Sequence, residues 1–155
     1  MSIKQILTRI LNTLKTIQDL TSQPILHASG EVTVNSAQVY EIARITVPAG
    51  SRYLVLASTD LVTGQTQQQA CYITAMAGTP LEYYGGTSVK VPGTNGGGCA
   101  TWLICITGDE AVTWAVMCYG YNTSSHKERG HIAGIPIGLG TISSSSLPSA
   151  NGEAF

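Results

Sequence analysis

The chain has 155 residues, a net charge of −1 and only 11% charged residues, so hydroxyl and amide groups must supply most of its polar surface. This length allows one domain of moderate size with short appendages. Because no excess of basic residues is present to neutralise phosphates, the composition argues against a nucleic-acid partner.

The first predicted element is a helix over residues 1–23. Its apolar residues recur at alternating spacings of four and three, which is the repeat of a coiled-coil seam: Ile3, Leu7, Ile10, Leu14 and Ile17. Leucine at a with isoleucine at d favours three or four strands over two. We therefore predict these five as oligomerisation residues of a homotrimeric stalk. The alternative is an amphipathic helix that packs on its own domain.

Both ends of this helix carry signals. Ser2 and Gln5 have the spacing of a capping box, and Pro24 disfavours helical geometry in the residue before it. Residues 24–28 are predicted as a linker. Charged residues interrupt the N-terminal apolar positions and no apolar run approaches the length of a membrane span, so we expect no secretory signal, no membrane partner and synthesis in a cytosol.

From residue 29 to residue 140 the pattern is that of an antiparallel β-domain. Turn residues recur at intervals of about eight to twelve positions, which is typical of a sandwich or jelly roll. The predicted strands are 31–34, 39–47, 53–58, 70–77, 81–84, 88–91, 101–107, 111–121 and 132–137. The fold class predicted is mainly β: an antiparallel jelly-roll β-sandwich with an N-terminal α-helical coiled-coil stalk.

Three of the predicted strands are apolar on both faces: 53–57, 102–106 and 111–121. Such strands are covered on both sides. A neighbouring subunit would cover the second face and supply association that a short stalk lacks. The alternative is that long loops of the same subunit cover it.

Four cysteines lie within or beside predicted strands: Cys71, Cys99, Cys105 and Cys118. Without a closely spaced pair they are predicted as buried free thiols rather than zinc ligands, with Cys99 the most exposed because it follows a run of glycines. His126 and His131 lack the tight spacing of histidines that share a metal ion on a trimer axis, so no metal site is predicted.

No catalytic motif is present, and we predict a non-enzymatic protein without a cofactor. Aromatic residues near strand ends or glycine-rich loops are the candidate ligand-binding residues, since exposed aromatics stack on sugars or fill partner pockets. They are Tyr83, Tyr84, Trp102 and Tyr121. The alternative is packing in the core, which we expect for Trp102 before ligand binding and for Tyr83 and Tyr84 as readily as ligand binding. Loops 60–69, 87–98 and 122–130 are the candidate recognition surface.

Three phrases of this sequence resemble those of the trimeric jelly-roll heads of phage tail-fibre, head-fibre and baseplate proteins, which are broadly similar to the complement C1q and tumour-necrosis-factor heads. The phrases are ITVPAGSRYLVLAS at 45–58, CYITAMAGT at 71–79 and IAGIPIG at 132–138. The resemblance covers roughly residues 29–138, and a coiled coil before the head is usual for those fibres. Pro136 fits the last strand only at an edge or where its nitrogen faces no partner.

The function predicted is that of a structural virion protein of a bacteriophage. It would be a trimeric fibre or a capsid or tail appendage, made in the host cytoplasm. Its partners would be two further copies, other virion proteins of the capsid, collar or tail, and a host-surface glycan or protein. The alternative is a carbohydrate- or protein-binding module on a cell surface. Residues 141–155 are serine-rich and are predicted as a flexible tail.

Overall fold

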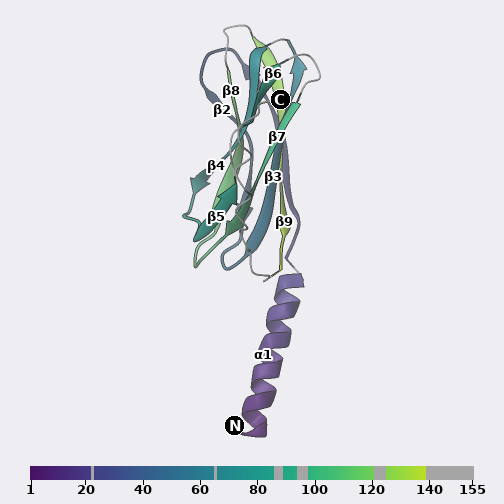
Figure 1. Cartoon of the computed structure of the whole chain (residues 1–155), viewed down its shortest axis with the longest axis vertical. Coiled ribbons are helices and arrows are strands. Elements are labelled where there is room, and N and C mark those ends of the chain that lie inside the picture. Colours follow the sequence, from purple (N-terminus) through teal and green to yellow (C-terminus); the bar gives the residue numbers. More distant parts are fainter. Residues whose placement is uncertain (22, 65, 86–88, 94–97, 121–124, 139–155) are drawn as a thin grey trace, which may run out of the picture.

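The computed structural model describes residues 1–21, 23–64, 66–85, 89–93, 98–120 and 125–138. In these residues one helix is followed by nine strands (Figure 1). The elements are α1 Ile3–Thr21, β1 Leu26–Val34, β2 Val39–Val47, β3 Arg52–Thr63, β4 Thr66–Ala77, β5 Glu82–Gly85, β6 Val89–Gly93, β7 Gly98–Ile106, β8 Val112–Tyr119 and β9 His126–Pro136. The predicted tail, 141–155, lies outside the described residues.

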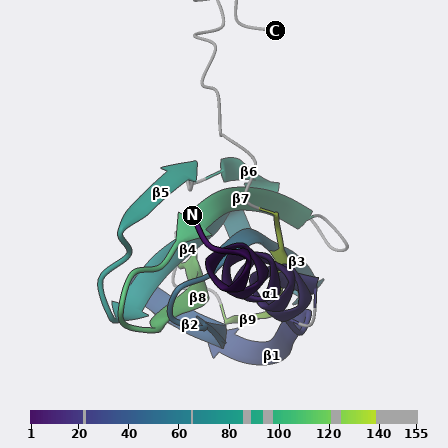
Figure 2. The ribbon, with the colours of Figure 1, turned by 90° about the horizontal axis from the view of Figure 1, so that it is seen from below.

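The strands form two antiparallel sheets. The five-stranded sheet has the order β1-β9-β3-β7-β5, and the four-stranded sheet has the order β2-β8-β4-β6. Odd-numbered strands lie in one sheet and even-numbered strands in the other, so every connection crosses between the sheets. Figure 2, seen from the α1 end, shows the strands arranged around a common core. The prediction of a mainly β, antiparallel sandwich with an N-terminal helix is confirmed.

Helix α1 extends away from one end of the sandwich (Figure 1). The predicted capping box forms. The backbone N–H of Gln5 donates to Ser2 Oγ at 3.3 Å, and the backbone N–H of Ser2 donates to Gln5 Oε1 at 2.8 Å. The described apolar residues of the helix stay exposed, from 44% at Ile6 to 78% at Ile3. The helix therefore does not pack on its own domain.

The core lies between the two sheets and is built from alternate residues of their strands. Its largest fully buried members include Tyr53, Leu103 and Ile132 of the five-stranded sheet, and Val112 and Val116 of the four-stranded sheet. This burial follows from the period of two, which sends every second side chain inward.

The two sheets approach closely where β1 and β9 pair. Gly30 lies opposite Gly130 in that ladder, and both face Ile42, which sits at a register shift of β2. A Cβ atom on Gly30 would lie within 2.2 Å of the Ile42 carbonyl oxygen, and one on Gly130 would lie 2.9 Å from the Ile42 side chain. Glycine is therefore required here by space rather than by backbone conformation.

Several strands are longer than predicted. Strand β1 begins at Leu26, inside the stretch predicted as a linker, and β9 begins at His126 rather than near Ile132. Pro136 is the last residue of β9 and pairs with Tyr53 only, because the β1 ladder ends at Leu26 opposite Gly134. Pro136 therefore lies beyond the β1 ladder, and β9 can stay between β1 and β3 in the sheet.

Candidate interaction surface

The outer face of the five-stranded sheet carries a run of apolar side chains. Buried and exposed positions alternate along β3, so Leu54 and Leu56 point away from the core. In the ladder with β7, Leu54 lies opposite Ile104 and Leu56 lies opposite Trp102. Residues that face each other across a ladder share a face of the sheet. These four side chains therefore form a continuous outward patch.

Strands β9 and β5 widen this patch. Ile135 and Ala133 of β9 lie opposite the two outward leucines of β3, and Tyr84 of β5 lies opposite Ile104. We call the following seven residues the apolar face: Leu54, Leu56, Tyr84, Trp102, Ile104, Ala133 and Ile135.

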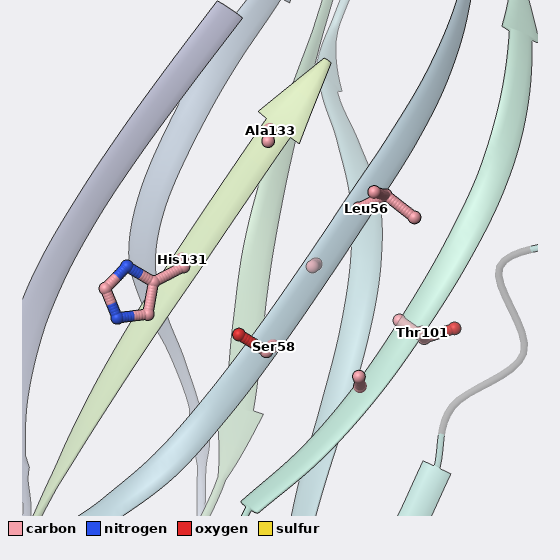
Figure 3. A pocket seen from close by; sticks show the side chains of 7 residues that line it. Leu56, Ser58, Thr101, His131 and Ala133 are labelled. Carbon is pink, nitrogen blue, oxygen red and sulfur yellow. The ribbon is translucent and has the colours of Figure 1, made fainter. Parts of the chain in front are cut away.

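Four members of the apolar face are well exposed: Trp102 by 51%, Tyr84 by 41%, Leu56 by 40% and Ile135 by 38%. Beside them the face is hollowed by about 340 Å³, between Leu56 and Ala133 on one side and Ser58 and His131 on the other (Figure 3). Contiguous apolar surface of this kind makes the apolar face a candidate interaction site.

The same outer face becomes polar away from α1. At the edge of the hollow, the ring of His131 stacks on that of His27, which lies opposite Ala133 in the β1 ladder, with centroids 6.2 Å apart. Further along, Glu31 accepts from Lys127 Nζ at 3.2 Å and lies 3.7 Å from the Arg129 guanidinium. The apolar face is thus confined to the half of the sheet nearer the helix.

The apolar face and the helix meet at one end of the sandwich. The Tyr53 hydroxyl donates to the Pro24 carbonyl at 2.9 Å, which ties the start of β3 to the segment that follows α1. Leu54 is the next residue of β3, so the apolar face begins where the helix ends. Two exposed apolar surfaces therefore adjoin on this chain.

The outer face of the four-stranded sheet differs. Ala115 and Met117 point outward from β8, yet their exposures are 0% and 9%. Met117 lies between Glu41 of β2 and Tyr72 of β4, whose longer side chains flank it in the ladders. The second face of β8 is covered within this chain and needs no neighbouring subunit. The apolar residues on this face of β8 therefore give no reason to expect a subunit contact at 111–121.

The predicted ligand-binding aromatics do not converge on one site. Tyr84 and Trp102 share the apolar face, where the Tyr84 hydroxyl donates to Glu82 Oε2 at 2.7 Å, and this hydrogen bond raises the pKa of Tyr84. Tyr83 turns to the other side of β5 and meets Trp114 edge-on, with ring centroids 5.9 Å apart. Tyr121 lies outside the described residues.

Two of the predicted recognition loops are largely strand. Strand β3 continues to Thr63, β4 begins at Thr66, and β9 takes up the residues from His126 onward. Of the third loop, 87–98, the described part is β6 with the first residue of β7. Clusters of polar residues predict loops. In β9, however, the first two inward positions are polar themselves, so the start of this strand was predicted as a loop.

Those inward positions hold a buried ionisable pair. His126 Nε2 lies 3.0 Å from Glu128 Oε1, and neither side chain is exposed. Burial raises the pKa of Glu128, although the hydrogen bond with His126 acts in the opposite direction. His131 points to the outer face instead, so the two histidines are not brought together. Among the described residues no group of side chains is arranged to hold a metal ion.

The predicted site residues do not include five members of the apolar face: Leu54, Leu56, Ile104, Ala133 and Ile135. The available signal was the apolar character of 53–57 and 102–106 on both faces, which the register then joins into one surface. No protein-family model matches this chain, and no curated protein matches it. In the described part of the chain, no helix is both long and apolar enough to cross a membrane.

Proposed function

We propose that the protein is a structural, non-enzymatic virion component of a bacteriophage. In this proposal it is a homotrimeric fibre or a capsid or tail appendage, with α1 forming a coiled-coil stalk and the sandwich forming a jelly-roll head. Its other partners are virion proteins, and its heads are available to bind a host-surface glycan or protein.

The strand order supports the jelly-roll assignment. A jelly roll packs eight strands into two sheets by means of two Greek keys. When the short edge strand β5 is set aside, the sheets are β1-β9-β3-β7 and β2-β8-β4-β6, four strands each. Strand β1 pairs with β9 and β2 pairs with β8. This nested pairing is expected when a long hairpin is rolled up.

One observation carries the proposal of self-association: the exposed helix stripe adjoins the exposed apolar face. Leucine at a with isoleucine at d in the stripe favours three strands or more, and a helix of 19 residues is too short to hold chains together alone. A contact through the apolar face supplies the missing association. The virion assignment itself is supported by the three phrases at 45–58, 71–79 and 132–138.

A monomeric binding module on a cell surface is the second candidate. It is favoured by the exposed rings of Tyr84 and Trp102, which lie on the same face of neighbouring strands, and by the Glu82 carboxylate bonded to Tyr84, since exposed rings and a polar group suit stacking on a sugar. The two functions make opposite demands on Trp102, because a ring buried between subunits is closed to a glycan.

Sedimentation velocity of the full chain at micromolar concentration tests the proposal. A trimer is expected. Leu7→Lys with Leu14→Lys should splay the stalk while the heads stay associated, whereas Asn12→Lys with Thr16→Lys on the opposite helix face should change nothing. A monomeric wild-type chain that binds a glycan array would replace this proposal with the second candidate.

Genome context tests the virion assignment separately. Genes for tail, portal or capsid proteins are expected beside the coding sequence. Their absence would contradict the virion assignment but would not bear on the proposed trimer.

A further inference from the structure

The apolar face carries a projecting ring and a hollow side by side. Trp102 projects from β7, and 51% of its surface is exposed. The hollow of about 340 Å³ lies over β3, between β7 and β9. Three of the outward residues that line it are small: Ser58, Ala100 and Ala133. A projecting ring and a hollow lined by small residues are complementary in shape.

The hollow has the size and the chemistry to hold an indole ring. A cavity of about 150 Å³ is enough to bind benzene, so about 340 Å³ has room for the two fused rings of tryptophan. Leu56 and Ala133 offer apolar contact, while Ser58 and His131 lie opposite each other on the polar side (Figure 3). The N–H of a buried indole usually finds a hydrogen-bond partner, and the Ser58 hydroxyl can accept it.

The proposed symmetry of the assembly brings the ring and the hollow together. Helix α1 and the strands run in nearly the same direction (Figure 1). A three-fold rotation about an axis parallel to α1 therefore moves each residue around the axis without changing its position along it. Trp102 lies opposite Leu56 in one ladder, and Leu56 lies opposite Ala133 in the next, so these residues lie at nearly one level. Trp102 of one copy thus reaches the level of the hollow in its neighbour.

A closed trimer also requires two different surfaces at each contact. In a two-fold dimer one surface meets the same surface of the partner, whereas in a ring of three one surface meets another surface of the next copy. The apolar face provides both of them, because its β7 side carries the projecting Trp102 and its β3–β9 side carries the hollow. Each surface is completed only by a second copy.

We propose that Trp102 of each copy inserts into the hollow of the next copy, with its ring against Leu56 and Ala133 and its indole N–H directed at Ser58. This inference rests on the proposed trimer and specifies which surfaces of the heads meet. Three such contacts close the ring. Every hollow is then filled, so no site remains for a fourth copy.

The test moves the ring from one surface to the other. All variants carry Leu7→Lys and Leu14→Lys, so that only the heads hold the chains together, and sedimentation equilibrium gives the concentration at which half of the trimer dissociates. Ala133→Trp fills the hollow from its own chain and excludes the neighbour's ring, so it should raise this midpoint by about tenfold or more. Trp102→Ala leaves the hollow empty and should also raise the midpoint. The two changes combined should give a midpoint below that of either single variant, because the hollow is filled and no ring is excluded.

A second measurement leaves Trp102 in place. Ala100 and His131 lie on either side of Ser58 in one row of the sheet, so the β7 side of one copy should bring Ala100 near His131 of the next. Chains with Ala100→Cys and chains with His131→Cys are mixed in the same background and treated with a short bismaleimide. Linked pairs should form in the mixture but not with either variant alone, since the four native cysteines are buried.

Val39→Trp, on β2 of the four-stranded sheet, is the matched control and should leave the midpoint unchanged. A combined variant that dissociates more readily than both single variants, a mixture without linked pairs, or Ala100→Cys chains that link to each other would overturn the inference. A background that stays monomeric while the wild-type chain is a trimer would also overturn it, because the stalk alone then holds the chains. A monomeric wild-type chain would instead refute the proposed trimer itself. Circular dichroism verifies that each variant is folded.

Discussion

Truncating Trp102 should dissociate the heads. About half of this side chain is exposed in the single chain, and a tryptophan presents up to about 250 Å², so covering it buries roughly 125 Å². At about 25 cal/mol per Å² that contact contributes roughly 3 kcal/mol per subunit and roughly 9 kcal/mol per trimer. The concentration at which half of a trimer dissociates varies as the square root of its dissociation constant. Trp102→Ala should therefore raise that concentration about a thousandfold.

The measurement is sedimentation equilibrium over a range of concentrations, in the Leu7→Lys, Leu14→Lys background so that only the heads hold the chains together. Val39→Ala is the matched control, because Val39 is 52% exposed but lies on β2 of the four-stranded sheet. Its dissociation midpoint should stay close to that of the background. A folded Trp102→Ala chain with an unchanged midpoint would show that the apolar face is not the contact between subunits.

Two further predictions concern the core. Because burial raises the pKa of Glu128 above the 4.5 of a free glutamate, its contribution is fully present at low pH and is lost as pH rises through the folded-state pKa. The melting temperature of wild type relative to Glu128→Gln should therefore fall as the pH rises above 4.5, and a rise would contradict this. Gly130→Ala should cost about 1–3 kcal/mol in chemical denaturation, because the new methyl meets three side-chain atoms of Ile42, the Cβ included, and much less in an Ile42→Gly background, which removes all three. Strictly additive effects of these two changes would refute the contact.

The sandwich was predictable because apolar and polar residues alternate along most strands and because turn residues separate the strands. The first half of β9, which begins at His126, was not predictable from this pattern. Its inward positions are a histidine, a glutamate and Gly130, so the period of two is present but the inward residues are not apolar. The residues that fill the space beside these inward positions, such as Ile42 beside Gly130, come from strands distant in sequence.

The site shows the same division. The apolar character of 53–57 and 102–106 on both faces predicts a partner that covers them. Leu56 of β3 and Trp102 of β7 are exposed in the single chain, so that contact stays a prediction. The same reasoning gives no contact at β8, since Ala115 is small enough for its neighbours Arg44 and Thr74 to flank and cover. Whether an outward residue stays exposed depends on the size of its ladder partners, and only the register supplies those.

If the chain associates and binds a receptor as proposed, the placement of its polar and apolar groups separates these two roles along its length. Apolar surface is concentrated from the helix to the middle of the five-stranded sheet, while the same face beyond His131 carries Lys127, Arg129 and Glu31. A surface with paired charges stays hydrated when subunits join, because desolvating such groups is unfavourable. Subunits that associate through the helix-proximal half would therefore leave the opposite end of each head in solvent. That end is where a host receptor would be met if the stalk is attached to a particle.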